Sequence, residues 1–205
     1  WIESVLNSQR EDGYFGPSYA WETANLENIK TENSYSKKKK PIDFWPNMIM
    51  LYCLQSYYEY SNDQRVIDLM TDYFKFQSSL DEKDLLSNEI YWHRIRGGDN
   101  LHSVIWLYNR TGEKWLLELA EKVYRRTAPW TSRGHDLNDI KNPKDKREGV
   151  EFPDWFTDII DWHNVNIAQG FRTPAQYYLL NGDEAYLNAT YENFNIVRAH
   201  FGQVT

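Results

Sequence analysis

The sequence predicts an all-α fold in which helical hairpins form about half of a closed toroid of six hairpins. Three observations lead to this prediction. Apolar residues recur at helical spacing, almost no segment alternates as a strand does, and one helix–turn–helix pattern occurs three times. A hairpin of this size cannot bury its own apolar face, so the copies are expected to stack. We therefore expect residues 1–205 to form a single, truncated domain.

The first part of the chain contains the end of one helix, a loop and a long helix. Residues 1–9 are expected to be a helix end, which the turn-rich stretch EDGYFGP stops. Residues 17–41 are polar and approach the next helix through four consecutive lysines, a pattern typical of a solvated loop. Helical spacing then returns, and Pro46 falls in the first turn of the new helix, where its missing N–H costs nothing.

The hairpin pattern is centred on a turn residue that moves from Asn62 to Gly112 to Gly182. Each copy has a tyrosine four or five residues before the turn and a helix rich in apolar residues after it. The copies are unequally spaced because long loops are inserted between them, including residues 132–155. Loops of that length in a compact domain are usually functional or disordered.

The helices that enter the three turns are expected to be the inner helices of the toroid, so that their starts meet at one end of the ring. Each start carries Asp and Asn with a tryptophan nearby, in DFWPN, in GGDNLH after EIYWHR, and in DWHNVN. Tryptophan offers a flat apolar face that stacks on the C–H face of a sugar, and the polar groups suit sugar hydroxyls. The inner helices are expected at 42–61, 99–111 and 161–181.

This pattern predicts a carbohydrate-lined cavity. The alternative is that the Asp and Asn residues are ordinary helix N-caps beside core tryptophans, because both residue types are preferred at that position. The predicted sugar-binding residues all lie at or just before the inner-helix starts: Trp45, Asn47, Trp92, Asp99, Asn100, His163 and Asn166.

Three aspartates at these starts are candidates for glycosidic acid/base chemistry. Hydrolysis requires two carboxyl groups that face each other across the bond, at about 5 to 10 Å. Asp43, Asp99 and Asp161 could supply such a pair, although each also fits a helix cap or a hydroxyl ligand. His93 and His102 are neighbouring candidates for the same cavity.

Composition excludes several other classes of protein. Aromatic residues make up 16% of the chain, which is too many for a disordered protein. The net charge is −7, so we expect no nucleic-acid partner. No apolar run approaches the length of a membrane span, and we expect no membrane partner. The single cysteine, Cys53, excludes an intrachain disulfide and a multi-cysteine metal site, and its apolar surroundings predict that it is buried.

Four stretches resemble the β-L-arabinofuranosidase-like glycoside hydrolases, families 127 and 146 and their relatives. They are QREDGYFGP, DFWPNMIMLYCLQSYYEYSNDQRVI, RGGDNLHSVIWLYNRTGEKWLLELA and WHNVNIAQGFRTPAQYYLLNGDEAYL. The segment from His163 to Gly170, followed by Pro174, is the most specific of them. The resemblance implies an (α/α)6 barrel and an enzyme that removes terminal sugars from plant or algal glycans.

The resemblance also implies catalytic groups that this chain does not match. Characterised relatives use a cysteine thiolate held by zinc, with further cysteines and two glutamates, and these residues lie downstream of the part that corresponds to Thr205. Cys53 is on an early inner helix and does not match the nucleophile. We therefore expect no catalytic residue, no metal and no cofactor in this segment, and zinc only in a full-length member.

Two functions stay open at this point. The first is an N-terminal part of a glycoside hydrolase that is inactive alone, and the second is a non-catalytic glycan-binding or scaffold module. In both cases the expected partner is a carbohydrate, with self-association possible through the open edge of the half-toroid. The resemblance is compatible with a periplasmic or secreted parent, but no signal peptide is recognisable at the start of the chain.

Overall fold

The computed structural model describes residues 1–16, 42–88, 90–131 and 164–201, and this part of the chain is helical without any strand. The predicted all-α hairpin fold is confirmed. The helices are α1 (Ile2–Leu6), α3 (Trp45–Ser61), α4 (Gln64–Ser79), α5 (Tyr91–Ile95), α6 (Gly97–Thr111), α7 (Trp115–Arg126), α10 (Asn164–Gly170), α11 (Thr173–Asn181) and α12 (Glu184–Phe201).

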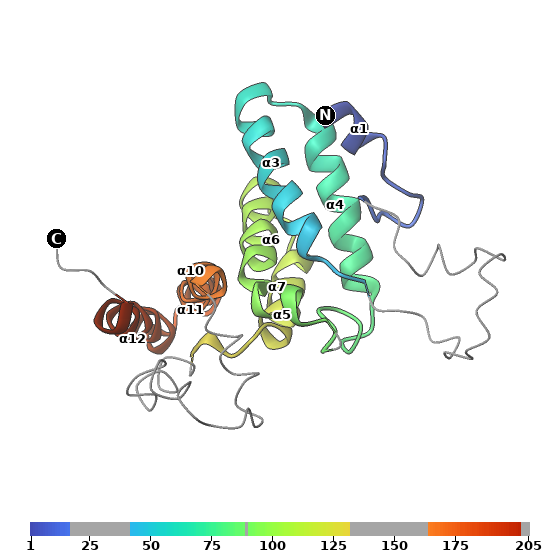
Figure 1. Ribbon diagram of the computed structural model, residues 1–205. Coiled ribbons are helices and arrows are strands. Elements are labelled where there is room, and N and C mark those ends of the chain that lie inside the picture. Colours follow the sequence, from blue (N-terminus) through green and yellow to red (C-terminus); the bar gives the residue numbers. More distant parts are fainter. Residues whose placement is uncertain (17–41, 89, 132–163, 202–205) are drawn as a thin grey trace, which may run out of the picture.

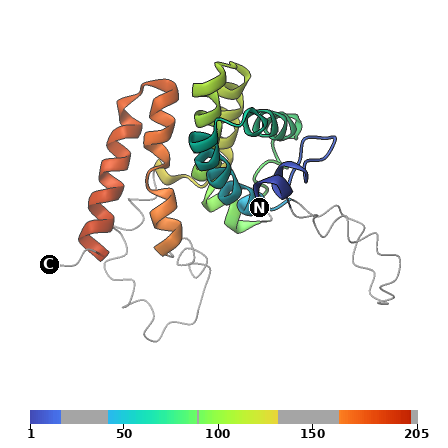
Figure 2. The same ribbon diagram turned by 90° about the horizontal axis from the view of Figure 1, so that it is seen from above.

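The hairpins α3–α4, α6–α7 and α11–α12 follow one another in space as they do in the sequence (Figure 1). Helix α6 is central, because it contacts α3 and α4 on one side, α10 and α11 on the other, and its own partner α7. Figure 2 shows the orange and red third hairpin beside the yellow-green second one, away from the N-terminus. The helices that enter the turns therefore contact one another in order, α3 with α6 and α6 with α11, as an inner row requires.

All three hairpin turns use the same backbone geometry. Each turn residue is left-handed, with φ of 54° at Asn62, 71° at Gly112 and 68° at Gly182. Glycine and asparagine tolerate this conformation, which explains why the sequence places them there. In every case the backbone N–H of the turn residue donates to the carbonyl of a tyrosine four residues earlier, Tyr58, Tyr108 or Tyr178.

The residue before each turn repeats a second contact. The side chains of Ser61, Thr111 and Asn181 accept a hydrogen bond from the backbone N–H two residues later, at 3.2, 3.4 and 3.0 Å. Asp63 and Asp183 then cap the following helices by accepting from the backbone N–H two residues on. These local contacts end the helix before all three turns, and at the first and third turns they also cap the helix that follows.

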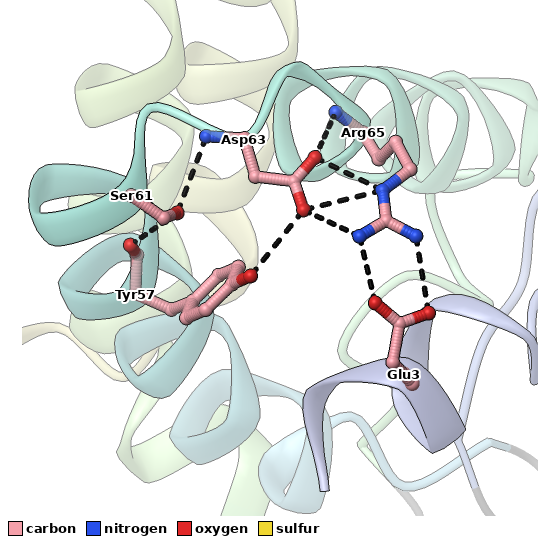
Figure 3. Close-up of polar contacts among 5 residues, drawn as sticks. All are labelled: Glu3, Tyr57, Ser61, Asp63 and Arg65. Carbon is pink, nitrogen blue, oxygen red and sulfur yellow. Dashed lines mark hydrogen bonds and ion pairs between the residues drawn. The ribbon is translucent and has the colours of Figure 1, made fainter.

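Helix α1 is attached to the first turn by a surface ion-pair network (Figure 3). The guanidinium of Arg65 donates to both carboxylate oxygens of Glu3, at 3.0 and 2.7 Å, and also to Asp63. Its hydrogen bonds lower the pKa of both carboxyl groups. Tyr57 donates to Asp63 from the other side, at 3.4 Å. Because these charges are exposed, the network orients α1 more than it stabilises the fold.

The third inner helix is not continuous, contrary to the expectation of one helix over 161–181. In its described part, α10 ends at Gly170 and α11 begins at Thr173. Pro174 causes this break, because it has no N–H to donate to the carbonyl of Gly170. The interruption places Arg172 at the N-cap of α11, where its side chain points back toward α3 and α6.

Two glycines let the start of α6 approach its neighbours closely. A Cβ added to Gly97 would lie 2.5 Å from Oγ1 of Thr127, and one added to Gly98 would lie 2.2 Å from Oγ1 of Thr173. Real Cβ atoms essentially never come this close to another atom, so a side chain at either position would force its neighbour to shift. The Gly-Gly pair therefore allows the start of α6 to pack closely against both the end of α7 and the start of α11.

The expectation that Cys53 is buried is wrong, because its side chain is exposed. The face of α3 that enters the core is formed by Met48, Leu51 and Leu54, and Cys53 lies outside that stripe. The error arose because α3 is apolar on both faces, so that periodicity alone did not identify the buried one. No helix in the described ranges is long and apolar enough to span a membrane.

The close approach at Gly98 predicts the effect of one methyl group. Gly98→Ala should lower the free energy of unfolding by about 1 to 3 kcal/mol, although alanine favours a helix, because its Cβ would overlap Thr173. Urea denaturation measures this. In the double variant Gly98→Ala/Thr173→Ala the hydroxyl is gone, and part of the loss should be regained. Equal losses in the single and double variants would contradict the close contact.

Candidate functional site

The three inner helices meet at the carboxylate of Asp99, in the first turn of α6. Tyr52 of α3 donates to its Oδ1 at 2.9 Å, and Nη2 of Arg172, at the start of α11, donates to the same atom at 2.6 Å. The same Nη2 also donates to the hydroxyl oxygen of Tyr52, at 2.8 Å. Asp99 is only 1% exposed, so this ion pair is enclosed on the carboxylate side. One residue from each hairpin therefore contributes to a single polar centre.

The charges of this centre are set by burial and by its own members. Burial and then the negative charge of Asp99 raise the pKa of Tyr52, so its hydroxyl keeps its proton. Burial opposes the charge on Arg172, but Tyr52 and Asp99 outweigh it and raise its pKa. His102 packs its ring 5.3 Å from that of Tyr52, and burial followed by Arg172 lowers its pKa. At neutral pH the centre thus contains one paired cation and a neutral imidazole.

A second cluster lies one turn earlier, around Arg96 at the N-cap of α6. Its guanidinium carbon lies 4.1 Å from the ring centroid of Trp45 and 5.0 Å from that of Trp92. Its Nε donates to Oδ1 of Asn166 in α10 at 2.9 Å. Three of the residues predicted to bind sugar, Trp45, Trp92 and Asn166, thus contact one arginine that the sequence did not point to. Trp92 is 41% exposed and presents its ring at the surface.

Asn47 and Asn100, two other predicted sugar-binding residues, face the interior. Asn100 is fully buried and exchanges two amide hydrogen bonds with Gln77 of α4, at 3.1 and 2.7 Å. Asn47 is 1% exposed and donates to the carbonyl oxygen of Phe15 at 2.6 Å. Both amides connect helices or loops inside the fold, which is a structural role.

Of the three remaining candidates, His163, Asp161 and Asp43, the structure describes only Asp43. His163 and Asp161 lie outside the described residues. Asp43 precedes Phe44, the N-cap of α3, and accepts the backbone N–H of Trp45, the first residue of the helix, at 3.0 Å. The capping alternative therefore describes Asp43 better than a role in acid/base chemistry.

His93 is a structural histidine behind the tryptophan cluster. It is fully buried, its Nδ1 accepts the N–H of Phe44 at 3.2 Å, and its Nε2 lies 2.9 Å from the carbonyl oxygen of Ser87. The accepting Nδ1 requires the proton on Nε2, which donates to Ser87. Burial lowers the pKa of His93 and outweighs the nearby carboxylate of Asp43.

Sequence reasoning missed Tyr52, Arg96 and Arg172. Tyr52 follows Trp45 by seven residues and therefore lies on the same face of α3, a signal that was available. Arg96 and Arg172 stand just before helix starts, where a positive charge is disfavoured by the helix dipole. An arginine at a helix start therefore indicates that a nearby side chain compensates its charge. Neither motif spacing nor composition shows which side chain that is.

The described residues do not form a metal site of the kind that the resemblance implies. No group of three His, Cys, Asp or Glu side chains in the described ranges could hold a metal ion. Cys53, the single cysteine of the sequence, lies exposed on α3. These residues therefore do not fit a zinc-bound thiolate.

Comparison with known proteins gave one match. The family model described as "Beta-L-arabinofuranosidase, GH127 catalytic domain" matches residues 1–205. No curated protein and no solved structure was found to match the chain.

The buried, neutral state of His93 predicts a pH dependence of stability. Its pKa is lower in the folded chain than the value of 6.5 expected when unfolded. The unfolded chain therefore binds more protons below that pH, and stability should fall as the pH drops through about 6.5 toward the folded pKa. Urea denaturation between pH 8 and 5 should show a shallower decline in His93→Gln. His102→Gln, which changes a less buried ring, should flatten the decline less; equal slopes in wild type and His93→Gln would contradict this account.

Proposed function

Because the chain belongs to the GH127 β-L-arabinofuranosidase catalytic-domain family, we propose that it forms part of the sugar cavity of a glycoside hydrolase. The proposed substrates are terminal β-L-arabinofuranosides or related sugars of plant or algal glycans. The observation that carries the proposal is the family match over the whole chain. The convergence of Tyr52, Asp99 and Arg172 from three hairpins at one end of the bundle supports it.

In this proposal the tryptophan cluster supplies the apolar part of sugar recognition. Arg96 lies over one face of both Trp45 and Trp92, which fixes the two indoles relative to each other. The exposed surface of Trp92 then offers a rigid platform for the C–H face of a pentose. The polar part comes from the centre around Asp99, one helical turn away along α6.

Bond cleavage is proposed to depend on groups outside the described residues. Hydrolysis needs two groups that flank the glycosidic bond. Asp99 is held in an ion pair and Asp43 accepts a backbone N–H at the start of α3, so both carboxylates already have partners within the fold. We propose that residues 1–205 bind the sugar without cleaving it, and that this segment itself holds no zinc.

A non-catalytic glycan-binding module is the second candidate. The commitment of Asp43 and Asp99 to contacts within the fold favours it, since binding alone requires no acid/base pair. The two candidates share the same sugar surface. They differ in whether the protein that carries this chain cleaves the bond, so one binding experiment and one hydrolysis experiment separate them.

The sugar surface predicts a loss of affinity when its platform is removed. Trp92→Ala should weaken binding of methyl β-L-arabinofuranoside roughly three- to tenfold, because a stacking contact contributes about 0.5 to 1.5 kcal/mol. Titration followed by saturation-transfer NMR measures the dissociation constant. Trp106→Ala is the matched control, since this indole packs on Tyr58 within the same bundle and should leave the affinity unchanged.

Hydrolysis of nitrophenyl β-L-arabinofuranoside, with and without zinc, completes the test. The chain should bind and not cleave, and the parent-length enzyme should do both. A parent that binds without cleaving would favour the glycan-binding module. Cleavage by residues 1–205 that survives Cys53→Ser would contradict the assignment of catalysis to other groups. A wild-type chain that binds no sugar would overturn the proposed function.

A further inference from the structure

The members of the Asp99 centre differ sharply in their access to solvent. The Arg172 side chain is 41% exposed, whereas that of Asp99 is 1% exposed. The second carboxylate oxygen, Oδ2 of Asp99, has no hydrogen-bond partner and is also buried. A ligand that approaches this centre therefore meets Arg172 first, and it reaches Asp99 only if Arg172 moves away.

We propose that Arg172 is the residue of this centre that contacts the sugar, and that Asp99 and Tyr52 are positioning residues that hold its guanidinium. This inference rests on the proposed sugar-binding function and assigns the contact within it. It reverses the roles that the sequence suggests, in which Asp99 is the ligand for the sugar hydroxyls.

The hydrogen bonds of Arg172 fit this division of roles. All of those that the structure gives it leave from Nη2, to Oδ1 of Asp99 and to the hydroxyl oxygen of Tyr52. Its Nε is buried without a partner, whereas Nη1 is not among the buried unpartnered atoms, so Nη1 is the nitrogen that a ligand can reach. Because Nη2 is anchored at two points, the planar guanidinium loses little further freedom when a ligand binds. Tyr52 supports this by donating to Asp99 while it accepts from Arg172.

The chemistry of Arg172 defines what it can bind. A guanidinium is a donor only, so its partner must be an acceptor oxygen. On a sugar that oxygen belongs to a hydroxyl, to the ring or glycosidic ether, or to the carboxylate of an acidic sugar. The adjacent His102 is neutral at neutral pH, because burial and Arg172 lower its pKa, so it adds no competing positive charge.

The two assignments predict opposite results for one substitution. If Arg172 contacts the sugar, Arg172→Ala should weaken binding about tenfold or more, as loss of a charge-assisted hydrogen bond does. If Asp99 contacts the sugar, the same change uncovers its carboxylate and should leave the affinity unchanged or increase it. Methyl β-L-arabinofuranoside and galacturonate are titrated in parallel by saturation-transfer NMR, so that hydroxyl and carboxylate acceptors are distinguished.

If Arg172→Ala lowers the melting temperature, two further variants separate a loss of sugar binding from a loss of stability. Arg172→Lys retains a charge for Asp99 but has no second nitrogen to offer, so it should also lose affinity while it stays folded. Arg110→Ala removes an arginine stacked on Trp106 at the other end of α6 and should bind as wild type does.

Positioning is tested by Tyr52→Phe, which removes the second anchor of Nη2. Tyr52→Phe should weaken binding several-fold without loss of the fold. In Arg172→Ala, guanidinium chloride added at millimolar concentration should partly restore binding, because a free guanidinium can pair with the intact Asp99. Wild-type affinity in Arg172→Ala or Arg172→Lys overturns the inference while the proposed function stands. Absence of binding by the wild-type chain overturns the proposed function itself.

Discussion

The arrangement of the three hairpins depends on the contacts of one buried carboxylate, that of Asp99. Removing a charge from water is costly unless an opposite charge and hydrogen bonds compensate it. Asp99 obtains both from other hairpins, a hydroxyl from Tyr52 on α3 and a guanidinium from Arg172 at the start of α11. The carboxylate therefore favours the one arrangement in which α3, α6 and α11 lie next to each other.

The rest of the inner surface is built so that this contact can form. Pro174 interrupts the third inner helix, and that break brings Arg172 to a helix start instead of a helix side. Gly98 allows the start of α6 to approach Thr173 without a clash. Arg96, one turn before Asp99, adds a parallel connection from the two tryptophans to α10. Both polar clusters thus lie at the same end of the bundle, which is the end where we propose that a sugar binds.

The sequence predicted what local rules determine and missed what depends on contacts between hairpins. Turn residues such as Gly112 and Gly182 were predictable, because left-handed backbone restricts the choice of residue. The buried face of α3 and the exposure of Cys53 were not, since which apolar face is covered depends on neighbouring helices. Asn100 looked like a ligand for the same reason: its partner, Gln77, lies on another helix and no motif joins the two.

The most direct test of this account is a double-mutant cycle on the ion pair that joins α6 to α11. The free energies of unfolding of wild type, Asp99→Asn, Arg172→Gln and the double variant are measured by urea denaturation. Because Arg172 is partly exposed, solvent screens the pair, and we expect a coupling energy of about 1 kcal/mol, with each single variant less stable than wild type. Additive effects, with a coupling below about 0.3 kcal/mol, would contradict the claim that this contact holds the hairpins together.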